Sequence, residues 1–325
     1  MNHTNSKFKA DPYNPSNQLI STQDVIHILQ KVNMNNFGAQ SMVACLKKVL
    51  MKSPQKFMSK VDLQKWNYAS PLDQDFINEN YNEFYKIIKN SGAEIVDLKL
   101  INENAELCDS IFTHDPSLVL KEGAIILNMG KKLRRKETEE HINFYNKEQI
   151  PIIGKIINNG LVEGGDCLWI NNKTLLVGES DRTNKSGINQ LSGILNKHNI
   201  LLIPIKLPKY DNEKSCFHLM SLISMLDEDL AIGCMSLLPL DLINLLNKNN
   251  IKVIEIPEDE YFDSKTLAVN ILALSPRNLV AMKGYPKTID LLYKYGCQIN
   301  LFSGSELCIK AEGGPTCLTR PIWRE

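Results

Sequence analysis

Short apolar runs alternate along the chain with longer segments in which apolar residues recur every three or four positions. The first pattern is typical of buried strands and the second of amphipathic helices. In segment 76–91, for example, Ile77, Phe84 and Ile88 fall at helical spacing. We therefore predict an α/β protein. The predicted helices are 76–91, 186–197, 240–248 and 287–295, and the predicted strands are 44–51, 94–98, 110–112, 124–127, 168–170, 174–178, 201–205, 216–224, 230–234, 252–256, 269–274, 279–282 and 298–301.

The predicted elements repeat in the order strand, strand, helix, strand, about five times with a period of roughly 60 residues. In one unit, strands 168–170 and 174–178 flank Asn171–Lys173, which is typical of a hairpin turn. Five such units around an axis would close into an α/β ring with strand ends meeting at its centre. An ordinary doubly wound α/β fold is the alternative that the periodicity alone leaves open.

The N-terminal segment lacks this pattern. Residues 1–20 are polar and rich in turn-forming residues, Pro12 and Pro15 among them. Such a composition buries too little apolar surface to order the chain, so we predict a flexible arm over residues 1–20. Residues 21–325 are predicted to form a single domain.

The bulk composition narrows the choice of partners. Of 325 residues, 43% are hydrophobic and 23% are charged, as in globular proteins with an ordinary core. The 37 basic and 37 acidic residues cancel, so neither nucleic acid nor an anionic membrane is an expected partner. The basic cluster 131–136 is interpreted as a solvated loop or the start of a helix. The oligomeric state stays open, and a homo-oligomer is among the states that the sequence allows.

The cysteines point to a reducing compartment. The chain has eight of them, none in a CxxC pair or at metal-finger spacing, so the cysteines do not predict a zinc-finger type of metal site. The N-terminal residues have no apolar signal core, and no apolar run approaches the roughly 18 residues of a membrane span. We therefore expect a cytoplasmic protein with free thiols. All but one of the cysteines are expected to be small buried hydrophobes.

The exception is Cys317, which follows a Gly313-Gly314-Pro315 turn near the C-terminal end of the chain. Two glycines and a proline fix the backbone and leave room for close approach. A thiol presented in this way is a candidate nucleophile, provided that a base and a substrate clamp lie elsewhere in the chain.

His218 is the candidate base, because the pKa of an imidazole lies near neutrality. It stands in an apolar run, where a lone histidine is more often a satisfied core residue, so the assignment depends on the nucleophile. His27, His141 and His198 are placed on exposed helical faces and are poorer candidates.

Carboxylates follow predicted strands or loops at several points. Glu163 and Asp166 bracket two glycines, and Asp109 and Asp115 lie around predicted strand 110–112. Acids gathered at one funnel would bind a planar guanidinium, which carboxylates grip bidentately. Exposed turns are the ordinary interpretation of such acids.

Arginines supply the opposite charge. Arg182, Arg134 and Arg135 are candidates for holding a substrate carboxylate, for which the guanidinium fork is the usual device. A site with acids for the guanidinium end of a substrate and arginines for its carboxylate end would suit a zwitterion such as arginine.

These motifs together resemble the guanidino-modifying, or pentein, superfamily, and within it the dimethylarginine dimethylaminohydrolases and arginine-deiminase-related proteins. The resemblance runs from about residue 107 to 319 and is specific because many motifs occur in order. They are 108–116, 133–137, 163–166, 178–184, 218–219 and 316–317.

The resemblance implies a five-bladed, pseudo-symmetric ββαβ propeller with its active site on the axis. It implies a hydrolase that acts on linear amidines, with Cys317 as nucleophile, His218 as proton shuttle and Glu163 as its acidic partner. It assigns the substrate pocket to Asp115, Asp109, Asp166, Glu312, Arg182 and one of Arg134 and Arg135. It implies a small guanidino substrate, such as arginine or an N-methylated arginine, and no cofactor.

Two residues depart from the family pattern. Met220 stands where arginine deiminases have an aspartate that grips the guanidinium, which favours the methylarginine hydrolases. His114 occupies a place that is often acidic in the dimethylargininases. An amidinotransferase, an arginine deiminase or dihydrolase, and a non-catalytic binding propeller are the alternatives.

Overall fold

The computed structural model describes residues 36–56, 58–103, 106–209 and 217–325. The arm predicted over residues 1–20 lies outside this range, and so does the predicted start of the domain at residue 21. Residues 36–325 form one compact unit.

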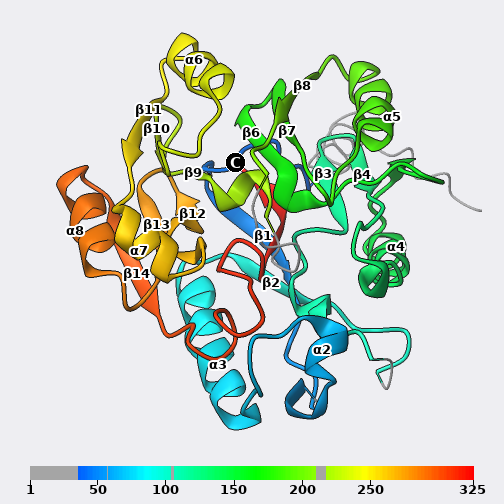
Figure 1. The fold of residues 1–325 in the computed structure, drawn as a ribbon. Helices are drawn as coiled ribbons and strands as arrows, with labels where there is room; N and C mark the ends of the chain where they lie inside the picture. Colours follow the sequence, from blue (N-terminus) through cyan, green and yellow to red (C-terminus); the bar gives the residue numbers. More distant parts are fainter. Residues whose placement is uncertain (1–35, 57, 104–105, 210–216) are drawn as a thin grey trace, which may run out of the picture. The chain divides into compact units, whose positions relative to one another are not determined.

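Residues 36–325 contain five three-stranded sheets of one design. In each sheet the middle strand pairs antiparallel with one neighbour and parallel with the other. A helix joins the two parallel strands, since parallel pairing requires a crossover. Figure 1 shows these helices around the periphery and the sheets inside them. The predicted five-bladed ββαβ propeller is confirmed, and the doubly wound alternative is excluded.

The five units differ mainly in the lengths of their elements. The sheets are β15 (Arg320–Arg324), β1 (Leu46–Met51) and β2 (Glu94–Asp97); β3 (Ser117–Leu120), β4 (Gly123–Ile126) and β5 (Ile152–Lys155); β6 (Cys167–Asn171), β7 (Thr174–Glu179) and β8 (Leu201–Lys206); β9 (Ile223–Met225), β10 (Leu230–Gly233) and β11 (Lys252–Glu255); and β12 (Leu272–Ser275), β13 (Asn278–Met282) and β14 (Gln298–Phe302). The crossover helices are α3 (Gln74–Asn90), α4 (Glu137–Lys147), α5 (Lys185–Asn196), α6 (Leu240–Lys248) and α8 (Pro286–Lys294), and the short helices α2 (Leu63–Trp66) and α7 (Glu258–Asp263) lie outside this pattern.

The last strand closes the ring. β15 pairs antiparallel with β1, with Leu50 opposite Arg320, so the first sheet contains both the first and the last described strands. In Figure 1 the segment that leads into β15 runs through the middle of the ring. This pairing carries Cys317, three residues before β15, to the place where the units meet.

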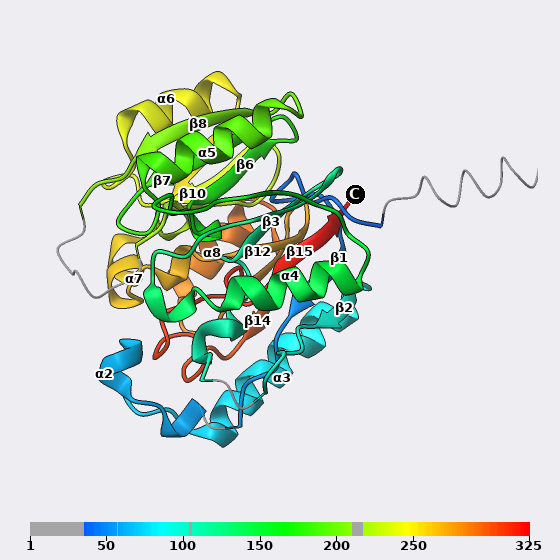
Figure 2. The same ribbon diagram turned by 90° about the vertical axis from the view of Figure 1, so that its right-hand side faces the viewer.

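The crossover helices cover their sheets with one apolar face each. In α3 the side chains of Ile77, Phe84 and Ile88 are fully buried, as the helical spacing predicted. Figure 2 shows α5 lying across the sheet of β6, β7 and β8. Burial of these faces is the main stabilising term of each unit.

Two predicted strands are wrong, and several elements were not predicted. Residues 110–112 do not form a strand, because Cys108–Ile111 is a 3₁₀ helix whose turn is closed by Ser110 and Phe112 amides. The predicted strand 216–224 is a 3₁₀ turn at Leu219–Ser221 followed by β9, with Cys216 outside the described residues. The strands β3, β5 and β15 and the helices α2, α4 and α7 were missed. α4 was missed because its buried face contains Glu137 and Glu140 beside its aromatic residues.

His141 does not lie on an exposed helical face, as predicted, but is buried, with 1% of its surface exposed. Its Nδ1 lies 3.0 Å from the Ser117 hydroxyl, which also bonds the Tyr145 hydroxyl at 2.7 Å. His114 is also buried, and its Nδ1 donates to the Thr319 carbonyl at 2.9 Å. Burial lowers the pKa of each imidazole to about 3, and nearby Arg320 adds to the shift.

These two histidines make the fold sensitive to acid. Their pKa is about 6.5 in the unfolded chain and about 3 when folded, so below pH 6.5 only the unfolded state takes up the protons. Stability is therefore full above pH 6.5 and falls toward pH 3, by about 1.4 kcal/mol per pH unit for each histidine. We expect His141→Gln to reduce the pH dependence of the free energy of unfolding by the contribution of one histidine, as measured by denaturant titrations between pH 4 and 6. An unchanged slope would contradict the assignment.

Candidate active site

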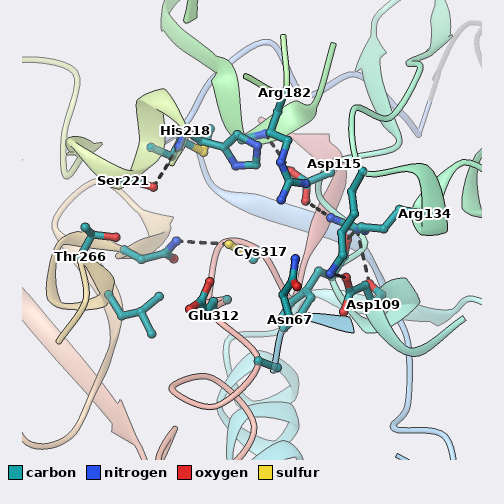
Figure 3. Close-up of a pocket in the computed structure, with 18 of the residues that line it drawn as sticks. Asn67, Asp109, Asp115, Arg134, Arg182, His218, Ser221, Thr266, Glu312 and Cys317 are labelled. Atoms are coloured by element: carbon teal, nitrogen blue, oxygen red, sulfur yellow. Dashed lines mark hydrogen bonds and ion pairs between the residues drawn. The ribbon is translucent and has the colours of Figure 1, made fainter. Parts of the chain in front are cut away.

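A cavity of about 160 Å³ opens where the five units meet, and Cys317 and His218 both line it. Figure 3 shows the side chains that point into it from several units. Most of the acids and arginines predicted for the substrate pocket are also part of its lining. Those are Asp109, Asp115, Arg134, Arg182 and Glu312.

Cys317 is held by its neighbours in the loop before β15. The amide of Asn270 donates to the sulfur at 3.3 Å, and its carbonyl accepts from the Thr316 backbone at 3.0 Å. The glycine turn allows this packing: a Cβ on Gly314 would lie 2.5 Å from Asn270 Cγ. The left-handed residue of the turn is Glu312, with a φ of 60°, and not a glycine.

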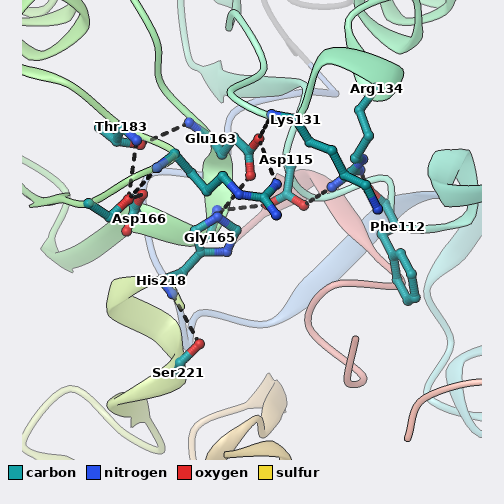
Figure 4. A network of polar contacts seen from close by, with 12 residues as sticks. Phe112, Asp115, Lys131, Arg134, Glu163, Gly165, Asp166, Thr183, His218 and Ser221 are labelled. Atoms are coloured by element: carbon teal, nitrogen blue, oxygen red, sulfur yellow. Dashed lines mark hydrogen bonds and ion pairs between the residues drawn. The ribbon is translucent and has the colours of Figure 1, made fainter. Parts of the chain in front are cut away.

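His218 is oriented by a buried carboxylate. Its Nε2 lies 2.9 Å from Oε2 of Glu163, which has no exposed surface and lies behind the ring (Figure 4). The other oxygen, Oε1, accepts from the Lys131 amide at 3.0 Å and from Arg182 at 3.4 Å. Burial opposes ionisation of Glu163, but His218 and Arg182 outweigh it and lower the pKa of this carboxyl. Glu163 therefore stays an anion next to the imidazole.

Gly165 makes room for the imidazole. A Cβ at this position would lie 2.2 Å from Nδ1 of His218, closer than real contacts allow. We expect Gly165→Ala to displace the ring and to lower kcat by about 10² or more, since a shift of roughly 1 Å has that effect. Gly193→Ala in α5 is the matched control, because no atom lies within 4 Å of its new Cβ. Steady-state kinetics of both variants test this prediction. Equal kcat values for Gly165→Ala and Gly193→Ala would refute this role for Gly165.

Asp166 lies outside the cavity lining, although the resemblance assigned it to the substrate pocket. It is fully buried, and its carboxylate accepts from the Leu219 amide at 2.9 Å and from the Ser180 hydroxyl at 2.6 Å. Since Leu219 follows His218, the structure gives Asp166 the task of anchoring the base's backbone.

Asp115 lines the cavity as a neutralised anion. Oδ1 accepts from the Gly165 amide at 2.9 Å, and Oδ2 pairs with Arg134 at 2.6 Å. Burial opposes ionisation, but Arg134 and two histidines outweigh it and hold the pKa of this carboxyl well below its ordinary value. The Arg134 guanidinium also donates to Glu137 at 2.9 Å and to the Phe112 carbonyl at 2.8 Å. It therefore links Asp115 to buried groups around the cavity.

Asp109 lines the cavity, and both of its carboxylate oxygens accept hydrogen bonds. Oδ1 accepts from the Tyr68 hydroxyl at 2.8 Å, and Oδ2 pairs with the Lys131 ammonium at 2.6 Å. Burial and the charge of Asp109 raise the pKa of Tyr68 well above its usual value, so the phenol remains a donor. The sequence interpretation of cluster 131–136 as solvated is therefore wrong at Lys131.

The two remaining arginine candidates differ in position. Arg182 lines the cavity with 18% of its side chain exposed and pairs with Glu163 at its back. Arg135 is not part of the lining; it is exposed, and its Nε donates to the Met129 carbonyl at 3.2 Å. Of the pair 134 and 135, the structure brings only Arg134 to the site. Met220 lines the cavity where arginine deiminases have an acid, whereas His114 is not part of the lining.

Sequence reasoning missed several cavity residues. Asn270 carries no motif of its own and is recognised only by its contacts with Cys317 and Thr316. Lys265 and Thr266 stand on consecutive left-handed residues, with φ of 52° and 72°, a strained backbone for side chains of their kind. Trp66 and Asn67 come from α2 and its cap, outside the repeat.

Within the described ranges, no three His, Cys, Asp or Glu side chains gather in a way that could hold a metal ion. The same residues include no helix both long and apolar enough to cross a bilayer.

The ring of five sheets and the central thiol site define a guanidino-modifying pentein. A family model described as arginine deiminase matches residues 104–239 and 236–324. These matches span more than half of the chain, and the chain belongs to the arginine deiminase family. The family hydrolyses guanidino groups, as the resemblance implied.

Relatives agree with this assignment. The dimethylarginine dimethylaminohydrolase of Pseudomonas aeruginosa is 27% identical over 259 residues, which cover 79% of this chain and 90% of the relative. A structure of that enzyme from the same organism, complexed with citrulline, superposes with a TM-score of 0.69 at 24% identity and covers 85% of this chain and 98% of its own. An amidinotransferase from Microseira wollei shares the fold, with a TM-score of 0.70 at 14% identity and coverage of 89% and 98%.

Proposed function

We propose that this protein hydrolyses one C–N bond of an arginine-type guanidinium, methylated or not, through a covalent intermediate on Cys317. One observation carries the proposal: Cys317 and His218 line one cavity with the anion Asp115, and Glu163 supports His218 from behind. Thiol, base and cation-binding acid are the groups that such a substitution needs.

In the first step the Cys317 thiolate attacks the guanidinium carbon and forms a C–S bond. The C–N bond to the leaving nitrogen then breaks, and His218 gives that nitrogen its proton. The departing group is ammonia or a methylated amine, and a thiouronium remains on the sulfur. Glu163 keeps the imidazole oriented and stabilises its protonated form.

In the second step water attacks the thiouronium carbon and His218 accepts its proton. The C–S bond breaks, Cys317 leaves as a thiolate, and a ureido product such as citrulline is released. We propose that Asp115, although paired with Arg134, uses the remaining lone pairs of its oxygens to hydrogen-bond the planar guanidinium and keep its carbon electrophilic. Arg182 is the arginine of the lining that we propose for a substrate carboxylate.

A product assay tests the proposal. The purified protein is incubated with arginine, mono- and dimethylated arginine, Nα-acetylarginine and agmatine, and ureido products and released amines are quantified. Turnover of at least one substrate, with one amine released per ureido product, is expected. The absence of any ureido product from all five, and from 4-guanidinobutyrate as a sixth compound, would refute the hydrolase.

An amidinotransferase is the second candidate, supported by the shared fold of the Microseira enzyme. It would use the same first step, after which an amine rather than water attacks the thiouronium. Addition of glycine or lysine as acceptor separates the two functions. A transferase would form a new guanidino product in place of the ureido product.

We also propose a cytoplasmic location, because the nucleophile must stay a free thiol. No disulfide joins any two cysteines of the described residues.

A further inference from the structure

Lys131 changes what the part of the cavity around Asp109 can bind. Its ammonium lies 2.6 Å from Oδ2 of Asp109, and both residues line the cavity. An isolated aspartate there would be a receptor for a substrate ammonium. With Lys131 beside it, Asp109 is already neutralised, and a second ammonium would meet the charge of the first.

Lys131 is fixed in this position by several contacts. Its ammonium donates to the Trp66 carbonyl at 2.7 Å and lies 5.4 Å from the centre of the Trp66 ring. Only 16% of its side chain is exposed. Its backbone amide bonds Glu163, so the residue belongs to the frame of the site and is not a mobile surface lysine.

The other cations of the lining reinforce this effect. Arg182 and Lys265 contribute a guanidinium and an ammonium to the same cavity as Lys131. Asp109 balances the charge of Lys131, so the attraction of a substrate carboxylate and the repulsion of a substrate ammonium come mainly from Arg182 and Lys265. Figure 3 places Asp109, with Asn67, to one side of Cys317, away from His218. A substrate whose reacting carbon lies at Cys317 can extend its tail toward this side.

We propose that the substrate is a guanidino carboxylate without a free ammonium: an arginine acylated on its α-nitrogen, or an ω-guanidino acid. The proposal rests on the proposed function for the chemistry at the guanidinium and specifies the opposite end of the substrate. Lys131 is the specificity-determining residue, because it neutralises Asp109, an acid of the lining on the side of the cavity away from His218 that would otherwise receive an α-ammonium.

The first test compares substrates on the unaltered protein. The kcat/KM values for Nα-acetylarginine and 4-guanidinobutyrate are measured against those for arginine and agmatine. We expect at least one of the two amine-free acids to exceed arginine by about 10-fold or more, and agmatine to be the poorest. Equal or better turnover of arginine or agmatine would overturn the proposal.

The second test changes the lysine. Lys131→Met uncovers Asp109, and the preference for the amine-free acid over arginine is expected to fall by about 10-fold or more. Lys132→Met is the control, since that neighbour is exposed and outside the lining. An unchanged preference in a folded Lys131→Met protein would remove Lys131 from the argument. If this variant does not fold, the substrate comparison decides alone.

The two levels of failure are distinguishable. If none of the guanidino compounds yields a ureido product, the proposed function itself fails. If arginine or agmatine is turned over as well as the amine-free acids or better, the hydrolase stands and the inference about the tail fails.

Discussion

Replacement of Cys317 by serine is expected to reduce turnover by about 10⁴-fold or more, because a hydroxyl cannot replace a thiolate toward a guanidinium carbon. The cavity should remain intact, since the change removes little volume and Asn270 can still donate to the new oxygen. Acid-quenched mass spectrometry during turnover should show the thiouronium adduct on the unaltered protein and none on the variant.

Cys45→Ser is the control for this prediction. Cys45 is the other partly exposed cysteine of the described residues and is not part of the cavity lining. The Cys45 variant should keep full activity and the adduct. If Cys317→Ser keeps more than about one hundredth of the activity, the chemistry lies elsewhere.

Replacement of Glu163 by glutamine should lower kcat by about 10²- to 10⁴-fold, with a smaller change in KM. Glutamine keeps the volume but loses the anion that orients His218 and pairs with Arg182. Removal of one partner of a buried pair also costs stability, by about 3 kcal/mol. Steady-state kinetics check the expected loss of kcat, and denaturant unfolding of the same preparation checks the expected loss of stability.

Glu140→Gln separates a site effect from loss of a buried carboxylate. Glu140 is buried in α4 and accepts from the Ile101 amide at 2.6 Å, but it is not part of the cavity lining. This variant should lose stability and keep its kcat. Equal kcat losses in the two variants would mean that Glu163 has only a structural role.

The repeat was predictable because each unit carries its own local signal. Period-3.6 faces such as that of α3, and short apolar strands such as β7, depend on neighbours in sequence. Residues 110–112 were predicted wrongly as a strand because a short apolar run is compatible with a 3₁₀ turn as well as with a short strand. α4 was missed because its buried face includes Glu137, a charged residue that is paired with Arg134 three positions earlier.

The sequence predicted which residue types form the site, but it did not predict the structural role of each residue. The motifs around Cys317, His218 and Glu163 carry the resemblance, and the structure brings these residues together. Asp166 and Arg135 share those motifs, yet one anchors a backbone amide and the other lies outside the cavity. Sequence spacing does not distinguish a side chain that faces the axis from one that faces its own sheet.

By itself the sequence indicated a repeat of about five units through local periodicity, and its ordered motifs indicated the family, with its five-bladed fold, and the candidate nucleophile. Only the tertiary structure decided which charges cancel one another in the cavity. From the sequence, Lys131 was interpreted as one lysine of a solvated cluster. In the fold, its ammonium pairs with Asp109 and its backbone amide donates a hydrogen bond to Glu163. Electrostatic pairing depends on distances across units far apart in the chain, and those distances exist only after the ring has closed.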